Sequence, residues 1–129
     1  MKRILPLFVL VGSASVLGSA LLSQFVGGLA PCDMCIWQRW PHAIAIALVA
    51  LGLLIKGPKA GGIYLIAGLV LMAGAGIGVF HAGVELKYWD GPGACTGGST
   101  IGLTPAQVLE QLLNAPLVRC DDIAWSFAG

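Results

Sequence analysis

The sequence predicts an all-α membrane protein, a bundle of transmembrane helices that forms a single integral membrane domain over residues 1–129. Of the 129 residues, 57% are hydrophobic and 10% are charged, whereas a soluble domain carries about 25% charged residues. The formal net charge of +1 provides no basic surface for a phosphate backbone. The composition therefore excludes both a soluble domain and a nucleic-acid-binding protein, and the partner that it implies is the lipid bilayer.

Three uncharged runs are the candidate membrane spans, since about 20 apolar residues cross the hydrocarbon core. The runs cover residues 4–32, 40–55 and 60–84, which are 29, 16 and 25 residues long. The second run is short, but Arg39 and Lys56 at its ends can extend their charged groups toward the interface. We expect spans at about 4–29, 41–55 and 61–82, followed by an outer cysteine loop and tail at 83–129.

Glycine spacing in the third span predicts a close contact between helices. Gly74 and Gly78 are four residues apart, so both lie on one face of the helix. Two small residues at this spacing let a neighbouring backbone approach closely within a membrane. We therefore expect another span to pack against this face.

The basic residues predict the orientation of the chain. Lys2 and Arg3 precede the first span, and Lys56 and Lys59 lie in the turn between the second and third spans. Both clusters should be cytoplasmic, because Lys and Arg concentrate in the cytoplasmic segments of membrane proteins. The opposite, outer side then carries all four cysteines.

The first span has a second interpretation as a cleaved signal peptide. Lys2 and Arg3 resemble the basic start of such a peptide, and residues 18–20 (Gly-Ser-Ala) resemble its cleavage site. A signal peptide has an apolar core of about 7 to 15 residues, whereas here the apolar character continues through Leu29. We therefore expect a retained anchor.

The cysteines suggest redox chemistry on an oxidising side of the membrane. Cys32 and Cys35 form a Cys-x-x-Cys pair directly before the second span, where the N-terminus of a helix stabilises thiolates. The alternatives are a structural disulfide or half of a zinc site. A four-thiol zinc site is disfavoured because 24 residues separate Cys95 from Cys120, so we predict no metal centre.

Arg39 lies one helical turn after Cys35 and on the same face. Its guanidinium can stabilise a nearby thiolate and donate a hydrogen bond to a carbonyl oxygen of a lipid-soluble ligand. The alternative is an interfacial anchor within an aromatic belt that includes Trp37 and Trp40. Position alone favours the anchor.

The two histidines have different predicted roles. His81 ends the third span at the depth of Cys35 and Arg39, so it is a candidate donor to the same ligand or to a proton path. His42 follows Pro41 inside the second span, and we interpret it as a packing residue. Tyr88 and Trp89 are interpreted as further members of the aromatic belt.

The outer loop predicts a short interfacial helix. Thr104 and Pro105 have the form of an N-cap and a first helical residue, and Pro116 ends the segment. Apolar side chains gather on one face, as they do in a helix that lies on a bilayer or packs on the ends of the spans. The glycine-rich approach at residues 90–98 indicates a mobile loop that presents Cys95 to a partner.

Together these features resemble the DsbB family of bacterial inner membranes. The resemblance is carried by CDMCIWQRW at 32–40, His81, the separated Cys95 and Cys120, and VRCDDIAWSFAG at 118–129. Family members are four-helix bundles, of which the sequence contains three spans, so we expect the span after residue 129 to be missing.

The resemblance implies an enzyme, a quinone-dependent disulfide oxidoreductase. It would accept electrons from a reduced DsbA-like periplasmic dithiol oxidase and pass them to ubiquinone or menaquinone. Cys95 and Cys120 would form the disulfide that meets the partner, with Cys95 attacked first. Cys120 would reduce the Cys32–Cys35 pair through Cys32, and Cys35 would lie nearest the quinone. Arg39, and more loosely His81, would bind that quinone.

Two other functions are alternatives to this interpretation. A vitamin-K-epoxide-reductase-like protein is also a quinone-linked helical bundle, but its Cys-x-x-Cys is expected near the end of a late span. A small non-catalytic membrane protein would use its disulfides only to hold the outer loops together. The sequence contains no flavin, haem or nucleotide signature. The electrons must then pass to an acceptor dissolved in the bilayer, which favours the quinone-linked function.

Overall fold

The structure is a computed structural model that describes residues 4–55, 58–96, 102–113 and 118–123. In these residues it contains helices and no strand, which confirms the all-α prediction. The helices are α1 (Ile4–Phe25), α2 (Asp33–Leu54), α3 (Lys59–Glu85), α4 (Gly93–Thr96) and α5 (Pro105–Leu113). The predicted features at Lys2, Arg3, Lys56 and Pro116 lie outside the described residues.

The three long helices match the three predicted spans. Each of α1, α2 and α3 is long and apolar enough to cross a membrane. The boundaries differ from those expected: α1 ends at Phe25, before Gly28 with its positive φ of 69°. Helix α2 begins at Asp33, well before residue 41, because Cys32 caps it and the charged first turn continues the helix.

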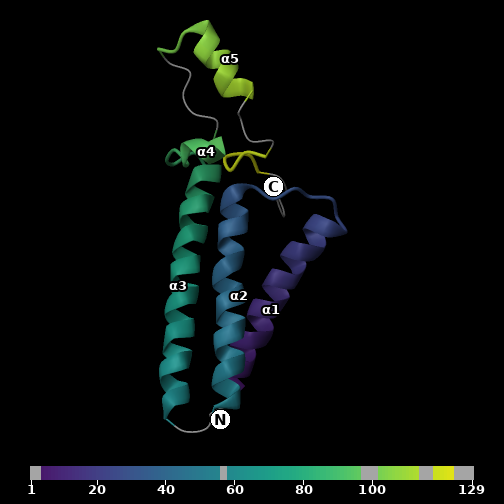
Figure 1. Cartoon of the computed structure of the whole chain (residues 1–129), viewed down its shortest axis with the longest axis vertical. Helices are drawn as coiled ribbons and strands as arrows, with labels where there is room; N and C mark the ends of the chain where they lie inside the picture. Colours follow the sequence, from purple (N-terminus) through teal and green to yellow (C-terminus); the bar gives the residue numbers. More distant parts are fainter. Residues whose placement is uncertain (1–3, 56–57, 97–101, 114–117, 124–129) are drawn as a thin grey trace.

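Helix α2 lies between α1 and α3 (Figure 1). It runs alongside α3, whereas α1 is near α2 at the N-terminal end of the chain and diverges from it toward the other end. That other end carries Cys32, His81 and α4, and we call it the cysteine end. Large apolar side chains along the spans, such as Phe8 and Met72, are exposed, as expected of helices whose solvent is lipid.

The contact between α2 and α3 depends on glycine. A Cβ atom placed on Gly74 would lie 2.7 Å from Cβ of Pro41, which confirms the predicted close approach at this position. Gly78 has more room, since its nearest neighbour would be Oε1 of Gln38 at 4.0 Å. Nearer the other end, a Cβ on Gly52 would overlap the ring of Tyr64. Small residues therefore set the distance between the two helices.

A cluster of buried residues lies at the cysteine end. The cluster contains Cys32, Met34, Val84, Cys95 and Cys120, with Cys35 and Val118 packed against it. Its members come from the start of α2, the end of α3, α4 and the segment after α5. This cluster joins the four cysteines, while Ala45, Val49 and Ala67 are buried farther along α2 and α3.

Helix α5 stands apart from the three spans, beyond α4 (Figure 1). The predicted cap is confirmed: the backbone N–H of Gln107 donates to Oγ1 of Thr104 at 3.4 Å, and that of Thr104 donates to Oε1 of Gln107 at 2.9 Å. Leu109, Leu112 and Leu113 are exposed, so they do not pack on the ends of the spans. The position of α5 on a bilayer surface stays a prediction.

Replacing Gly74 by Ala should destabilise the bundle. The new methyl group would overlap the rigid ring of Pro41, and overpacking of this kind costs about 1–3 kcal/mol. Gly76→Ala is the matched control, because a Cβ there has no neighbour within 4 Å. Both variants gain the same helix propensity of about 1 kcal/mol, so their difference isolates the overlap. Equal thermal unfolding midpoints in detergent would contradict the α2–α3 contact described here.

Candidate thiol-disulfide site

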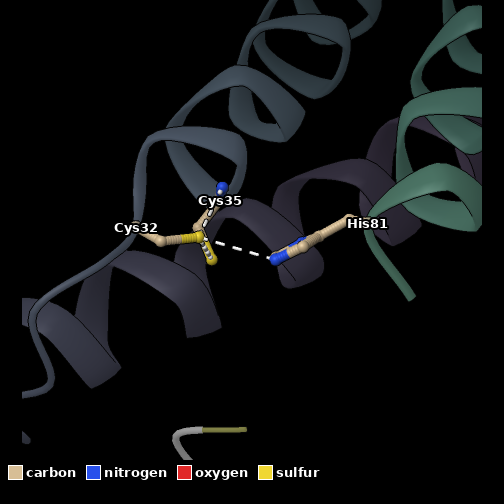
Figure 2. Close-up of side chains that lie close together, drawn as sticks. All are labelled: Cys32, Cys35 and His81. Atoms are coloured by element: carbon tan, nitrogen blue, oxygen red, sulfur yellow. Dashed lines mark hydrogen bonds between the residues drawn. The ribbon is translucent and has the colours of Figure 1, made fainter. Parts of the chain in front are cut away.

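Cys32 and Cys35 meet at the first turn of α2 (Figure 2). Cys32 is the N-cap in an extended conformation, and its Sγ accepts the backbone N–H of Cys35 at 3.2 Å. The two sulfur atoms are 2.8 Å apart, and both residues are free thiols in the structure. The hydrogen bond to Cys35 and burial raise the pKa of Cys32. Cys32 therefore keeps its proton and donates it to Sγ of Cys35.

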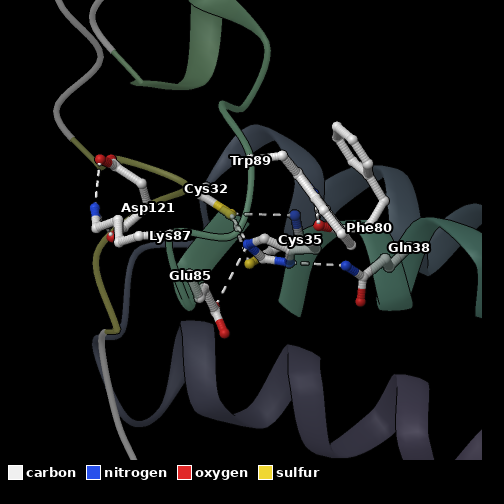
Figure 3. Close-up of polar contacts among 9 residues, drawn as sticks. Cys32, Cys35, Gln38, Phe80, Glu85, Lys87, Trp89 and Asp121 are labelled. Carbon is white, nitrogen blue, oxygen red and sulfur yellow. Dashed lines mark hydrogen bonds and ion pairs between the residues drawn. The ribbon is translucent and has the colours of Figure 1, made fainter. Parts of the chain in front are cut away.

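His81 of α3 lies against this pair and is 7% exposed. Its Nε2 is 3.6 Å from Sγ of Cys32 and 3.5 Å from Oε1 of Glu85. Its Nδ1 is 2.8 Å from Nε2 of Gln38 (Figure 3). The amide nitrogen of Gln38 can only donate, so Nδ1 accepts and the ring proton lies on Nε2. The protonated nitrogen thus faces Cys32 and Glu85.

Gln38 is a site residue that the sequence reasoning missed. It lies one turn after Cys35 and one turn before His42, so the three side chains share a face of α2. That periodicity was the available signal, although it predicted a role only for Arg39. The partner of Gln38 is 43 residues away on α3, which no local pattern reveals.

A cavity of about 330 Å³ lies between α1, the segment that follows it and α2. Cys35, Gln38, Arg39 and His42 line its α2 side, and apolar residues such as Val16 line the α1 side. The guanidinium of Arg39 donates to Oε1 of Gln24, while Nδ1 of His42 is buried without a hydrogen-bond partner among the described residues. His81 does not line this cavity; it touches Gln38, which does.

Cys95 and Cys120 extend the row of sulfur atoms. Both are 1% exposed, and the backbone N–H of Cys120 donates to the carbonyl of Cys95 at 2.9 Å. The side chain of Cys120 interacts with that of Cys95 and also with that of Cys32, within one buried cluster. Burial and the contact with Cys120 raise the pKa of Cys95 to about 12. The thiols therefore form a continuous chain in the order Cys95, Cys120, Cys32, Cys35.

The burial of Cys95 corrects one expectation from the sequence. A mobile, exposed loop was expected at residues 90–98, of which 97 and 98 lie outside the described residues. Instead Cys95 lies in the short helix α4, where its N–H donates to the carbonyl of Pro92 at 2.8 Å. Cys95 is buried because of a tertiary contact, in which the segment that carries Cys120 packs over it. Cys95 is therefore covered in the arrangement that the structure describes.

Asp121 fixes the segment that carries Cys120. Its carboxylate is 2.7 Å from Nζ of Lys87, which also donates to the Asp121 carbonyl at 2.7 Å (Figure 3). The same carboxylate is 2.8 Å from Nη2 of Arg119. Hydrogen bonds from Arg119 and Lys87 hold the pKa of Asp121 well below its usual range. The residue therefore stays ionised at neutral pH, and the segment is tied to the end of α3.

The predicted belt residues lie at the cysteine end. Trp37, Trp40, Tyr88 and Trp89 are all exposed. Trp89 is also fixed, since its indole N–H donates to the carbonyl of Phe80 at 2.9 Å and its ring stacks on that of Phe80 (Figure 3). A Cβ on Gly83 would overlap this indole, so Gly83 allows the ring to fold back over α3.

The fold and the site define a class of protein: a multi-pass membrane protein with a chain of four thiols at one end, of which Cys35 is partly exposed and the other three are buried. Comparison with known sequences identifies the family. The family described as "Disulfide bond formation protein DsbB" matches residues 2–129. The chain therefore belongs to the DsbB family, which supports a role as a disulfide oxidoreductase and implies a partner for disulfide exchange.

Individual relatives agree with this membership. The disulfide bond formation protein B of Xanthomonas oryzae pv. oryzae is 31% identical over 125 residues, which cover 90% of this chain and 70% of the relative. The protein of that name from Stutzerimonas stutzeri is 30% identical over 132 residues, covering 98% of this chain and 80% of the relative. No solved structure matches the chain significantly.

Proposed function

We propose that this protein reoxidises a DsbA-like dithiol oxidase in the periplasm and passes the electrons to a membrane quinone, ubiquinone or menaquinone. It would reside in the bacterial inner membrane with its cysteine end on the periplasmic side. The observation that carries the proposal is the continuous chain of thiols from Cys95 through Cys120 and Cys32 to Cys35. A protein that used its disulfides only as staples would need no contact between the two pairs.

The first exchange takes place at Cys95. A thiolate of the partner attacks Sγ of Cys95 in the Cys95–Cys120 disulfide, and Cys120 leaves as a thiolate. The second thiol of the partner then attacks the mixed disulfide, which oxidises the partner and releases Cys95. Each step makes one S–S bond and breaks one, so two electrons enter this protein and the two protons of the partner are released.

The second exchange carries the electrons between the pairs. The thiolate of Cys120 attacks Cys32 in the Cys32–Cys35 disulfide and displaces Cys35 as a thiolate. Cys95 then attacks Cys120, which restores the Cys95–Cys120 disulfide and releases Cys32. The electron pair now resides on Cys32 and Cys35. The contact between the side chains of Cys120 and Cys32 supports this order.

His81 assists this transfer. Its Nε2–H, held in that tautomer by Gln38, faces Sγ of Cys32 at 3.6 Å. A donor at this position stabilises negative charge on Cys32 as the sulfur leaves Cys120. We therefore assign His81 a role at the thiols, with any effect on the quinone transmitted through Gln38.

The cavity beside Cys35 fits the head group of a quinone. It has an apolar wall on α1 and a polar face on α2 where Gln38, Arg39 and His42 converge. The buried Nδ1 of His42 has no partner among the described residues, and a ligand carbonyl or hydroxyl is the kind of group that satisfies it. Arg39 and His42 would hold the ring next to Cys35. When bound, a quinone supplies an acceptor for two electrons and two protons.

Cysteine variants test the relay. Cys95→Ser should abolish exchange with the partner, because the sulfur that the partner attacks is gone. Cys35→Ser should leave that exchange measurable but stop turnover with quinone. The measurement is partner oxidation under single- and multiple-turnover conditions, followed by thiol trapping after acid quenching. In the unmodified protein, depletion of quinone should cause thiols to accumulate, whereas merely structural disulfides would stay oxidised. Full multiple turnover by Cys95→Ser would rule out the assigned order.

Arg39→Lys and His42→Ala test the proposed quinone site in the cavity beside Cys35. Lys keeps the charge of Arg39 but loses its planar fork of donors, and loss of a charged hydrogen bond of about 1.5–3 kcal/mol raises the apparent KM for quinone roughly tenfold or more. His42→Ala should raise this KM less, since a neutral hydrogen bond contributes about 1 kcal/mol. Exchange at Cys95 should be normal in both variants.

Arg119→Lys is the control for these two variants, because Arg119 is absent from the cavity lining and its exposed side chain meets Asp121. Its KM for quinone should equal that of the unmodified protein. An unchanged KM for quinone in Arg39→Lys would indicate that Arg39 is an interfacial anchor and would contradict its role in binding the quinone.

A further inference from the structure

We propose that the reduced Cys32–Cys35 pair and His81 together form a binding site for a thiophilic divalent cation of the Zn²⁺ type. Sγ of Cys32, Sγ of Cys35 and one ring nitrogen of His81 all lie within 4.8 Å of one another. The proposal goes beyond electron transfer and does not depend on it, because it concerns a state in which the pair is reduced and no electron moves. Figure 2 shows the three side chains converging from α2 and α3.

The geometry suits tetrahedral coordination. Zn–S bonds of about 2.3 Å and Zn–N bonds of about 2.0–2.1 Å at tetrahedral angles separate a sulfur from a nitrogen ligand by roughly 3.5–3.6 Å. Sγ of Cys32 and Nε2 of His81 are 3.6 Å apart. Two thiolate ligands would be about 3.8 Å apart by the same geometry, so the present S–S separation of 2.8 Å must open by about 1 Å. Rotation of the partly exposed Cys35 side chain provides that movement.

The surroundings also support a cation site. The N–H of Cys35 already donates to Sγ of Cys32 at 3.2 Å, and the start of α2 favours thiolates. Gln38 contacts Nδ1 of His81; with its amide turned over, Oε1 would accept Nδ1–H and free Nε2 to bind the cation. A ligating histidine usually has such an acceptor at its other nitrogen.

Charge balance explains why a divalent cation is tolerated at a buried position. Binding replaces the two S–H protons by one M²⁺ ion, so the two thiolates cancel its charge and two protons leave for solvent. The ring proton of His81 moves from Nε2 to Nδ1, and no atom is oxidised or reduced. Three protein ligands leave a fourth position for water or for Cys120, whose side chain contacts Cys32.

The spacing of Cys95 and Cys120 disfavours a metal site of four thiols. The structure provides a different ligand set, because α3 brings His81 to within reach of a cysteine 49 residues away. Cation and disulfide would compete for the same two sulfur atoms. A bound cation would therefore hold the pair reduced and block the relay.

The test uses the full chain in detergent, carrying Cys95→Ser and Cys120→Ser so that Cys32 and Cys35 are the only thiols. The reduced, desalted protein is titrated with ZnCl₂ in competition with a chromophoric chelator, and Co²⁺ spectra report the ligands. We expect one Zn²⁺ per reduced chain, none after oxidation of the pair, and tetrahedral Co²⁺ bands with thiolate charge transfer. His81→Ala should weaken Zn²⁺ binding at least tenfold, the loss that follows removal of an outer-shell partner alone.

His42→Ala is the matched control, since His42 is a histidine of α2 that is absent from the ligand set. This variant should change the affinity for Zn²⁺ less than twofold. Equal affinities of the two histidine variants would overturn the proposal, as would equal Zn²⁺ binding before and after oxidation. If His81→Ala does not fold, the Co²⁺ spectrum of the His81-containing protein decides: octahedral bands without thiolate charge transfer overturn the site. Because binding is measured without turnover, a failed relay and a failed cation site are distinguishable.

Discussion

The rest of the site depends on the contact between α2 and α3 at the cysteine end, where the ring of His81 lies between Gln38 and Cys32. Two features of the helices make this contact possible. The N-cap at Cys32 puts both sulfur atoms of the pair at the first turn of α2. Gly74 lets the backbone of α3 approach Pro41 closely. A wider separation of the helices would remove His81 from hydrogen-bonding distance of both partners.

The two halves of the thiol chain are held with different strengths. Cys32, Cys35 and His81 lie on long helices that pack directly on one another, and moving them would break the α2–α3 contact. Cys95 and Cys120 lie on segments outside the spans, where Asp121 is held by two largely exposed cations, Lys87 and Arg119. Exposed ion pairs contribute only about 0–1 kcal/mol each. These ion pairs therefore add little to the cost of opening the outer segments.

The difference in how strongly the two cysteine pairs are held reconciles the burial of Cys95 with the proposed disulfide exchange. Cys95 is 1% exposed, and burial raises the pKa of its thiol, so a partner has no access to it in the closed arrangement. In the proposed exchange, opening of the segment around Cys120 would expose Cys95 without disturbing the helices that hold Cys32 and Cys35. The same segment, when closed, brings Cys120 against Cys32. Alternation between the two arrangements would separate partner exchange from internal transfer.

The sequence was sufficient to predict what local patterns determine. Uncharged runs predicted the three spans, the pair at Cys32 and Cys35 was expected at the start of a helix, and Gly74 was expected at a close contact. Tertiary contacts determined the rest. The hydrogen bond from Gln38 to His81 joins residues on different helices, and the burial of Cys95 results from packing by a distant segment. The unsatisfied Nδ1 of His42 is likewise visible only once its neighbours are placed.

Contact between Cys120 and Cys32 would allow electrons to pass between the two pairs. The most direct measurement uses the Cys35→Ser, Cys95→Ser protein, in which Cys32 and Cys120 are the only thiols. Mild oxidation of the folded protein in detergent, followed by peptide mass spectrometry, should find a nearly complete Cys32–Cys120 disulfide. The complementary Cys32→Ser, Cys120→Ser protein should leave Cys35 and Cys95 largely unpaired. Failure of Cys32 and Cys120 to pair, or equal pairing in both proteins, would contradict the contact between Cys120 and Cys32 and the electron transfer that it supports.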